Sequence, residues 1–159
     1  MEFRHLHPWD VSIEDAADIQ RDLRRRVSLV DGFDQIRLVA GVDMSVPGGA
    51  REGRAAVAVL SFPDFSLVEL QRATSRLTMP YIPGFLSFRE TPVILAAFEK
   101  IVRVSDIIIV DGQGIAHPRG LGIAAHLGLL LDTPAIGCAK SHLFGVYEEP
   151  GWGGSIRDL

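Results

Sequence analysis

The sequence predicts an α/β protein in which a mixed sheet is flanked by helices. The first half contains three segments of strand-like pattern joined by short turns, which is typical of an antiparallel meander. The second half reads helix, strand, helix, strand, an order that calls for parallel pairing through a right-handed crossover. With 159 residues, of which 47% are hydrophobic and 23% charged, the chain has the size and composition expected of one globular domain over residues 1–159.

Composition and charge exclude several classes of protein. The net charge is −4, from 16 Lys and Arg against 20 Asp and Glu, so the chain as a whole has no basic field for non-specific nucleic-acid binding. Contact with nucleic acid must therefore be local or mediated by metal ions bound to carboxylates. The N-terminus lacks the apolar segment of a secretory signal, and the best apolar run, residues 107–110, is too short to cross a bilayer.

Cysteine usage bears on the compartment. The single cysteine, Cys138, cannot form an internal disulfide. It lies in an apolar run, where we expect it to act as a small buried hydrophobic side chain. A reducing environment follows, and a cytoplasmic location is predicted.

The first helix is expected to begin after Ser12, which has Asp15 three positions later as a capping partner. Its apolar stripe extends from Ile13 to Val30, and the Asp-Gly pair at 31–32 ends it. The opposite face is rich in arginine. Pairing with neighbouring aspartates on a solvated surface is favoured there over contact with phosphate.

Three strands are predicted next. Arg37–Val46 has a strand-like pattern stopped by a Pro-Gly-Gly turn, and Arg54–Phe62 is an Ala- and Val-rich strand closed by Pro63 and Asp64. Ser66–Leu77 alternates polar and apolar residues, which is typical of a strand with one solvent-facing side. The short turns between these strands favour antiparallel pairing.

The second half is predicted to continue as a helix from Thr91 to Val102, with a proline in its first turn, where proline is favoured. A strand at Ile107–Val110, a helix at Pro118–Leu131 and a strand at Ala135–Cys138 follow. Residues 150–159 are rich in glycine, and we expect them to form a loose, disordered tail.

Three acidic residues occupy positions that suit chemistry. Asp43 lies within a predicted strand, where a carboxylate is costly to bury unless it is paired or holds a metal ion. Asp111 directly follows a strand, at the end where sheet-based sites form, and Glu90 lies just before a predicted helix. The structural alternatives are an ion pair for Asp43, a turn for Asp111 and the positive helix end for Glu90.

Taken together, the three carboxylates suggest a metal site. Hard oxygen ligands suit one or two magnesium ions, and the sequence offers no Cys/His spacing typical of zinc. The chemistry that needs such ions is phosphoryl transfer, in which they activate a water molecule and stabilise the leaving oxygen.

A glycine-rich segment, Asp111–Gly120, follows the strand that ends at residue 110. Its glycines let the backbone approach a ligand closely, and Pro118 is expected to open the next helix, whose free N–H groups favour an anion. His117 would then be the N-cap of that helix. A dinucleotide-binding turn is discounted, because the spacing departs from G-x-G-x-x-G and the upstream meander does not fit.

Two further segments attract attention. Pro80–Gly84 is a stiff loop with Tyr81 at its tip, which suits an aromatic wedge for a base stack, although packing of Tyr81 on the core is the commoner fate. Lys140, just past the last strand, could supply a cation to phosphate, with a plain surface lysine as the alternative. His126, inside an apolar helix, is expected to be structural.

These motifs, taken in order, resemble the endonuclease V family, the deoxyinosine 3′ endonucleases. The resemblance rests on Gly41-Val42-Asp43, Pro80-Tyr81-Ile82-Pro83-Gly84, Phe88-Arg89-Glu90, Asp111-Gly112-Gln113-Gly114 with Ala116-His117-Pro118-Arg119, and Gly137-Cys138-Ala139-Lys140-Ser141. It implies a ribonuclease-H-like fold. It also implies magnesium- or manganese-dependent cleavage of a strand on the 3′ side of a deaminated base.

The resemblance carries over to particular residues. The metal-binding carboxylates of the family match Asp43, Glu90 and Asp111. Its wedge and base pocket match Tyr81, Pro83, Gly84, Leu86 and Gly112. Residues near the scissile phosphate match His117 and Lys140, whereas Arg119 fits the motif without an assigned role.

The expected function is therefore that of a DNA repair endonuclease whose substrate is DNA containing deoxyinosine or another deaminated base. Family members continue beyond the position of Leu159 with a strand and a helix that contribute a fourth polar residue to the metal site. A catalytically impaired inosine-binding fragment is therefore one alternative. An inosine-specific ribonuclease is another, because the sequence does not separate DNA from RNA.

Overall fold

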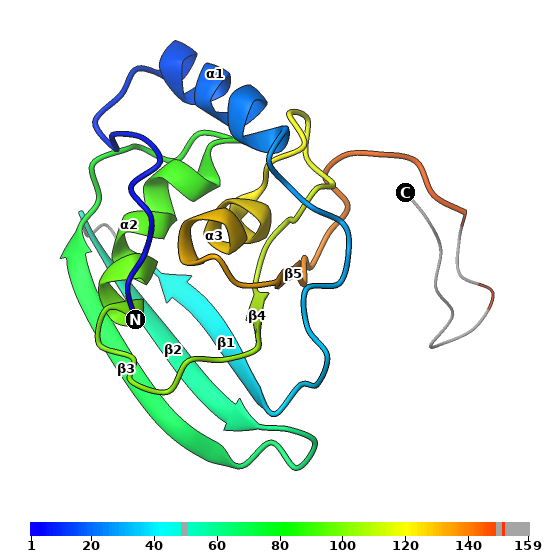
Figure 1. Ribbon diagram of the computed structural model, residues 1–159. Coiled ribbons are helices and arrows are strands. Elements are labelled where there is room, and N and C mark those ends of the chain that lie inside the picture. The colour runs from blue at the N-terminus through cyan, green and yellow to red at the C-terminus, as the bar shows by residue number, and fades with distance from the viewer. Residues whose placement is uncertain (49–50, 149–150, 152–159) are drawn as a thin grey trace.

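The computed structural model describes residues 1–48, 51–148 and 151 (Figure 1). Within this part, five strands form one sheet in the order β3-β2-β1-β4-β5. The strands and helices in chain order are α1 (Ile13–Arg24), β1 (Leu38–Ser45), β2 (Glu52–Ser61), β3 (Leu67–Arg76), α2 (Leu86–Phe98), β4 (Ile107–Val110), α3 (Ile123–Leu131) and β5 (Ala135–Gly137).

The sheet is mixed, as the sequence predicts. Strands β1, β2 and β3 pair antiparallel, while β1, β4 and β5 pair parallel. The predicted meander and the predicted parallel pairing are both confirmed. The parallel register sets Val42 beside Val110, so β4 ends three residues before the end of β1.

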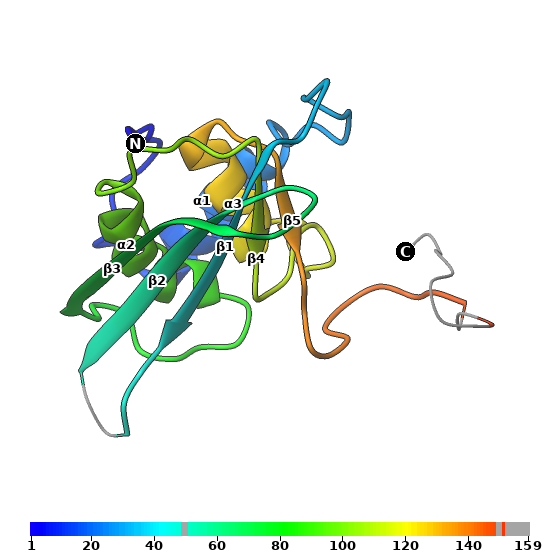
Figure 2. The same ribbon diagram turned by 90° about the horizontal axis from the view of Figure 1, so that it is seen from below.

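The helices of the described part lie on one side of the sheet (Figures 1 and 2). The core lies between the sheet and these helices, and it is built from alternate strand residues and the apolar faces of α2 and α3. Its central members are Ala40, Val42, Val57, Val59, Ile94, Phe98, Ile108, Val110, Leu127 and Leu130.

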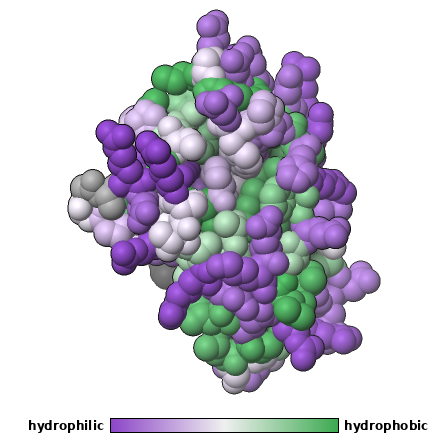
Figure 3. Space-filling model, turned by 90° about the vertical axis from the view of Figure 1, so that its left-hand side faces the viewer, coloured by the Kyte–Doolittle hydropathy of each residue, from purple (hydrophilic) through white to green (hydrophobic). Residues whose placement is uncertain are grey.

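The opposite side of the sheet has no helix over it in the described part. The register aligns Leu70, Ala58, Gly41, Ile109 and Ile136 across all five strands on this side. Ile136 is 52% exposed as a result. At the free edge of the sheet, β3 carries charged side chains between its apolar ones, and the view from that side shows hydrophilic and hydrophobic patches interspersed (Figure 3).

Helix α1 begins as predicted but ends earlier. Ser12 Oγ accepts a hydrogen bond from the Asp15 amide (3.1 Å) and donates one to the Asp15 carboxylate (2.7 Å). The helix ends at Arg24, so its expected extension to Val30 is wrong. Nothing in the described structure covers that continuation, and Val30 is 82% exposed. The aspartate–arginine pairing is confirmed by Arg21–Asp18 and Arg25–Asp22.

Helix α2 begins five residues before the expected position, at Leu86, and ends at Phe98 rather than at Val102. Pro92 is therefore inside the helix, not in its first turn. Proline there removes one helical hydrogen bond, but the preceding turn buries Phe88 completely, and this burial offsets the loss. Glu90 consequently lies within the helix, so its alternative role at a helix end is wrong.

Helix α3 begins at Ile123, not at Pro118, and its N-cap is Gly122. The expectation that His117 caps this helix is wrong. The chain takes a left-handed conformation at Gly120 (φ +68°), which interrupts any helix that starts earlier. At the start of α3, the Gly122 amide donates to the Gly114 carbonyl (2.7 Å) and the Ala124 amide to the Gln113 carbonyl (3.0 Å), so these two amides are already engaged and the binding of an anion there stays a prediction.

Strand β5 ends at Gly137, and the expected burial of Cys138 is wrong, because its side chain is exposed. Alternation along the strand places Cys138 on the same side as Ile136, the side without a helix. The predicted tail at 150–159 lies outside the described residues apart from Gly151.

Candidate functional site

The ends of two neighbouring parallel strands bring acidic residues together. Asp43 lies two residues before the end of β1. Asp111 directly follows β4, whose last residue, Val110, pairs with Val42 of β1. Glu90 reaches the same region from α2. Burial is the main cause that raises the pKa of Glu90 to about 7, and the charges of Asp43 and Asp111 raise it further while Arg89 lowers it. The three predicted carboxylates therefore share one electrostatic environment.

The contacts of these carboxylates differ. Asp43 is exposed, and its Oδ1 accepts a hydrogen bond from the Met44 amide (2.7 Å). Asp111 Oδ2 accepts one from Lys140 Nζ (2.5 Å), and this bond raises the pKa of Lys140. Within residues 1–48, 51–148 and 151, no group of three or more His, Cys, Asp or Glu side chains is arranged to hold a metal ion. Lys140 thus forms an ion pair with Asp111 in this structure and is not an isolated surface lysine.

The loop of residues 80–84, called the proline loop below, exposes Tyr81 at its tip, while Ile82 packs against the core. Tyr81 is 68% exposed, whereas Met79 and Phe85 on either side are buried. The alternative in which Tyr81 packs on the core is therefore wrong. Pro83 is exposed beside it, and Leu86, at the start of α2, is half-buried.

Gly84 connects the proline loop to the segment after β4. Its φ of +80° lies in the left-handed region, and a Cβ there would come within 2.8 Å of Arg119 Nη2. Its carbonyl oxygen accepts three hydrogen bonds, from Gln20 Nε2 (3.1 Å), His117 Nε2 (3.0 Å) and Arg119 Nη2 (2.7 Å). We call Gln20, His117 and Arg119 the carbonyl clamp.

The tautomer of His117 follows from its two contacts. Its Nδ1 accepts a hydrogen bond from the Arg119 amide (3.2 Å), so Nε2 carries the proton that is donated to Gly84. The ring is 4% exposed, and burial lowers its pKa, which favours the neutral form. The structure thus places His117 against the proline loop, and its contact with a phosphate stays a prediction.

Gly112 is the second glycine-only position of the predicted site. Its φ is +151°, and a Cβ there would lie 2.5 Å from the Ile123 side chain. The loop that follows lies against β5, since a Cβ at Gly137 would come within 2.5 Å of both the Gly112 carbonyl and the Gly114 amide. The glycines of this segment therefore allow close backbone packing beside Asp111.

Sequence reasoning missed two members of the carbonyl clamp. Gln20 received no role, and Arg119 matched a motif without one. The signal for Gln20 is its position, because it lies on the buried stripe of α1 between Ala16 and Leu23 and is itself 1% exposed. A polar residue within an apolar stripe indicates a buried hydrogen-bonding partner.

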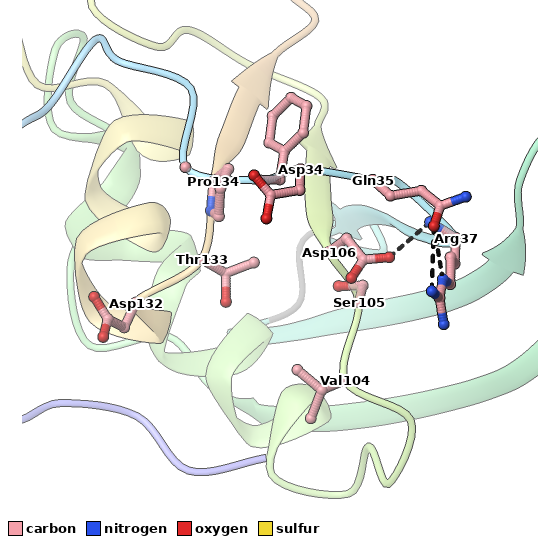
Figure 4. Close-up of a pocket in the computed structure, with 11 residues that line it drawn as sticks. Asp34, Gln35, Arg37, Val104, Ser105, Asp106, Asp132, Thr133 and Pro134 are labelled. Atoms are coloured by element: carbon pink, nitrogen blue, oxygen red, sulfur yellow. Dashed lines mark hydrogen bonds between the residues drawn. The ribbon is translucent and has the colours of Figure 1, made fainter.

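A cavity of about 480 Å³ lies elsewhere, and none of the predicted site residues lines it. Its lining includes Arg37, Asp106 and Pro134, which precede β1, β4 and β5 (Figure 4). It therefore opens at the amino ends of the parallel strands, whereas Asp43 and Asp111 lie at the carboxyl ends. Asp106 Oδ2 is already bonded to the amides of Arg37 (2.7 Å) and Leu38 (2.9 Å).

Comparison with known proteins identifies the family. The sequence model of the family Endonuclease V matches residues 21–158. Endonuclease V of Trichormus variabilis is 55% identical over 150 residues, covering 94% of this chain and 68% of the relative. The chain belongs to the endonuclease V family. Endonuclease V of Dehalococcoides mccartyi is 50% identical over 147 residues, covering 92% of this chain and 66% of the relative. This endonuclease V family chain thus spans about two thirds of the length of these relatives.

Solved structures of endonuclease V share the fold. The Bacillus subtilis protein superposes with a TM-score of 0.85 at 30% identity, covering 94% of this chain and 67% of that one. The Ciona intestinalis protein, solved with a 24mer DNA containing an inosine followed by a ribo-adenosine, gives a TM-score of 0.77 at 28% identity and covers 82% and 59%. The predicted ribonuclease-H-like fold class is confirmed, and the family is one of nucleases. Among the described helices, none is long and apolar enough to cross a membrane.

Proposed function

We propose that this endonuclease V family member is a DNA repair endonuclease that hydrolyses a phosphodiester bond on the 3′ side of deoxyinosine. The observation that carries the proposal is the hydrogen-bonded connection between the loop that exposes Tyr81 and the segment that begins at Asp111. The proline loop is bonded through Gly84 to His117, which lies in the segment that begins at Asp111. The relative from Ciona intestinalis, whose structure contains an inosine-bearing DNA, supports the choice of base.

Base extrusion explains how this arrangement would select its substrate. An enzyme that reads a base in a pocket must first take it out of the stack, and a mismatched inosine pair costs less to open than a matched pair. Tyr81, with Pro83 behind it, would fill the gap left in the stack. Gly84, Leu86 and Gly112 would line the pocket for hypoxanthine or another deaminated base.

A divalent metal ion is part of the proposal. The donor set fits in type, since carboxylate oxygens are what Mg²⁺ prefers, and Mn²⁺ accepts the same ligands. Asp43, Glu90 and Asp111 would hold the ion. Burial and the charges of Asp43 and Asp111 raise the pKa of Glu90, and a divalent cation held by the three carboxylates would stabilise its ionised form. When bound, the ion activates a water molecule and stabilises the leaving oxygen.

This chain's own residues would do the rest. Lys140 is hydrogen-bonded to Asp111, and its ammonium group is placed to neutralise charge beside a scissile phosphate. His117 would keep the proline loop in position next to that phosphate. A cytoplasmic location is part of the same prediction.

Two alternatives have an observation behind them. Among the described residues, no three or more His, Cys, Asp or Glu side chains are grouped closely enough to hold a metal ion, which is the observation behind an inosine-binding protein of impaired activity. The DNA in the Ciona intestinalis complex carries a ribo-adenosine after the inosine, which favours a test on RNA.

Cleavage of a labelled strand with one deoxyinosine tests the proposal. We expect a nick on the 3′ side with Mg²⁺ or Mn²⁺ and none with chelator. Selective binding of the same strand without a nick would favour the impaired binder. Faster cleavage of a matched inosine-containing RNA would favour the ribonuclease, and absence of both binding and cleavage would contradict all three.

A further inference from the structure

We propose that Gln20 and Arg119 are positioning residues that fix the proline loop against the segment after β4 and thereby set the selectivity for inosine over adenine. This inference rests on the proposed function. Gln20 lies just before the part of the chain matched by the family model, residues 21–158, so the match itself assigns it no role.

The hydrogen bonds of Gln20 connect three parts of the fold. Its Nε2 donates to the carbonyls of Gly84 (3.1 Å) and Leu121 (3.2 Å), while its Oε1 accepts from Arg119 Nε (2.5 Å). One amide from α1 therefore joins the proline loop to the loop before α3. Both of its polar atoms are bonded, which satisfies a side chain that is 1% exposed.

Arg119 strengthens the same connection from the other side. Its guanidinium group donates to Gly84 and to Gln20 and lies over the ring of Phe85, 4.2 Å from the ring centre. A planar guanidinium with fixed donors can make these two hydrogen bonds and the stacking contact together, which a lysine would reproduce only in part. Phe85 directly follows the proline loop, so Arg119 holds the loop by its backbone and by its neighbour.

Three donors on one carbonyl have two consequences. Gly84 is three residues from Tyr81, and Pro80 and Pro83 restrict the backbone between them, so fixing this carbonyl also fixes the direction of the wedge. The carbonyl is also no longer free to accept a hydrogen bond from a base. Adenine carries an amino donor where hypoxanthine carries an oxygen acceptor, so the engaged carbonyl disfavours adenine at this peptide.

Substitutions at two positions, Gln20 and Arg119, test the clamp. Gln20→Met keeps the size of the side chain and removes its hydrogen bonds, while Arg119→Lys keeps the charge and Arg119→Met does not. Arg25→Gln is the matched control, since Arg25 is an exposed arginine next to the end of α1 that contacts Asp22 instead. Each variant is assayed for binding to a strand with one deoxyinosine and to the same strand with deoxyadenosine, in chelator. Hydrogen–deuterium exchange of the peptide covering residues 79–85 is measured without nucleic acid.

We expect Gln20→Met and Arg119→Met to reduce the inosine-to-adenine binding ratio roughly tenfold, because each removes one hydrogen bond to the Gly84 carbonyl and the bond between Gln20 and Arg119. Exchange over residues 79–85 should become faster in both. Arg119→Lys should lie between these variants and the unmodified chain, and Arg25→Gln should match the unmodified chain. A folded Gln20→Met protein with an unchanged ratio and unchanged exchange would overturn the inference. If Gln20→Met does not fold, the Arg119 pair decides by the same criteria.

The failure of the proposed function is distinguishable. Unmodified protein without any preference for inosine would contradict that function, and the exchange measurement, which needs no nucleic acid, would still decide whether the clamp fixes the loop.

Discussion

Asp43 and Asp111 at the ends of β1 and β4 and Glu90 from α2 have different surroundings, and these predict different behaviour. Asp43 is exposed, Asp111 is paired with Lys140, and Glu90 is half-buried, with its pKa raised to about 7 by burial and by the other two carboxylates. Removing either aspartate would take away an oxygen ligand and would also relieve the repulsion on Glu90. Activity and metal dependence therefore have to be measured together with folding.

Asp43→Ala and Asp111→Ala are expected to lower the rate of nicking at deoxyinosine at least about a hundredfold, because a bound metal ion contributes several kcal/mol to stabilising the transition state. Asp64→Ala, at the β2–β3 turn where Asp64 contacts Ser61 and Ser66, is the control and should retain activity. Single-turnover rates with saturating Mg²⁺ measure the effect. Nicking that persists in both aspartate variants would contradict the assignment of these ligands.

Tyr81→Ala is expected to weaken discrimination between inosine-containing and ordinary DNA, since aromatic stacking on a base contributes about 1–3 kcal/mol. Phe65→Ala is the matched control, because Phe65 is also an exposed aromatic, 55% accessible, but lies at the opposite end of the sheet. Competition binding with both strands gives the measurement. An equal loss of affinity for the two strands would indicate general contact rather than a wedge.

At the scale of elements, regular patterns were predictable and irregular connections were not. Strand β4 has the predicted bounds, because its four β-branched residues end abruptly at Asp111. Helices α2 and α3 have wrong predicted starts, since in both cases a proline was taken as a first-turn residue. Burial of Phe88 lets α2 begin before Pro92. The left-handed conformation of Gly120 makes α3 begin after Pro118.

The residues of the candidate site also differ in how well the sequence predicts them. The acidic residues at the strand ends and the stiff loop with Tyr81 could be located from the sequence, because a carboxylate at a strand end and an aromatic between prolines are visible there. The carbonyl clamp could not, since Gln20 and Arg119 are 99 positions apart and meet only when α1 packs against the loop before α3. The register of β1 and β4, which sets Asp43 beside Asp111, likewise depends on long-range pairing.

The cap of α1 offers a prediction at this scale. Ser12→Ala removes the hydrogen bond to the Asp15 amide and should lower the free energy of unfolding by about 1 kcal/mol, whereas Ser12→Asp should retain most of it. Urea denaturation of the three proteins measures the difference. Because Gln20 is on the same helix, a frayed α1 should also speed exchange over residues 79–85, although less than Gln20→Met does.

At the scale of the whole molecule, the N-terminal segment is hydrogen-bonded to the C-terminal ends of α2 and α3. The Met1 amino group donates to the Phe98 (3.2 Å) and Ile101 (2.7 Å) carbonyls, and the Arg4 amide donates to Leu130 (2.7 Å). Farther along, the imidazole of His7 meets that of His126, with 2.8 Å between the two Nε2 atoms. The expectation that His126 is structural is confirmed, because it is fully buried among aromatic rings.

Only one proton is shared between the two rings. His7 Nδ1 donates to the Pro8 carbonyl (2.7 Å), so its Nε2 is an acceptor and His126 Nε2 must be the donor. His126 Nδ1 is buried and has no hydrogen-bond partner in the described structure, so a proton added there would be a charge without an acceptor. Burial, reinforced by His7, accordingly lowers the pKa of His126 to about 3.

This pair predicts how stability depends on pH. Below pH 6.5 the unfolded chain protonates His126 while the folded chain does not, so stability is lost as the pH falls from 6.5 towards 3. For this one group the loss between pH 7 and pH 5 should be about 2 kcal/mol. The lowered pKa of His7 acts in the same direction, whereas the raised pKa of Glu90 acts in the opposite direction between pH 4.5 and about 7.

A difference measurement isolates the histidine. His126→Leu should be less stable than the unmodified chain at pH 7, since it leaves His7 without its partner, and this deficit should shrink as the pH is lowered to 5. The contribution of Glu90 cancels, because both proteins contain it. His5→Gln, at an exposed histidine, is the control and should keep the original pH dependence. A deficit that stays constant from pH 7 to pH 5, by urea denaturation, would show that His126 takes up its proton in the folded state as readily as in the unfolded one.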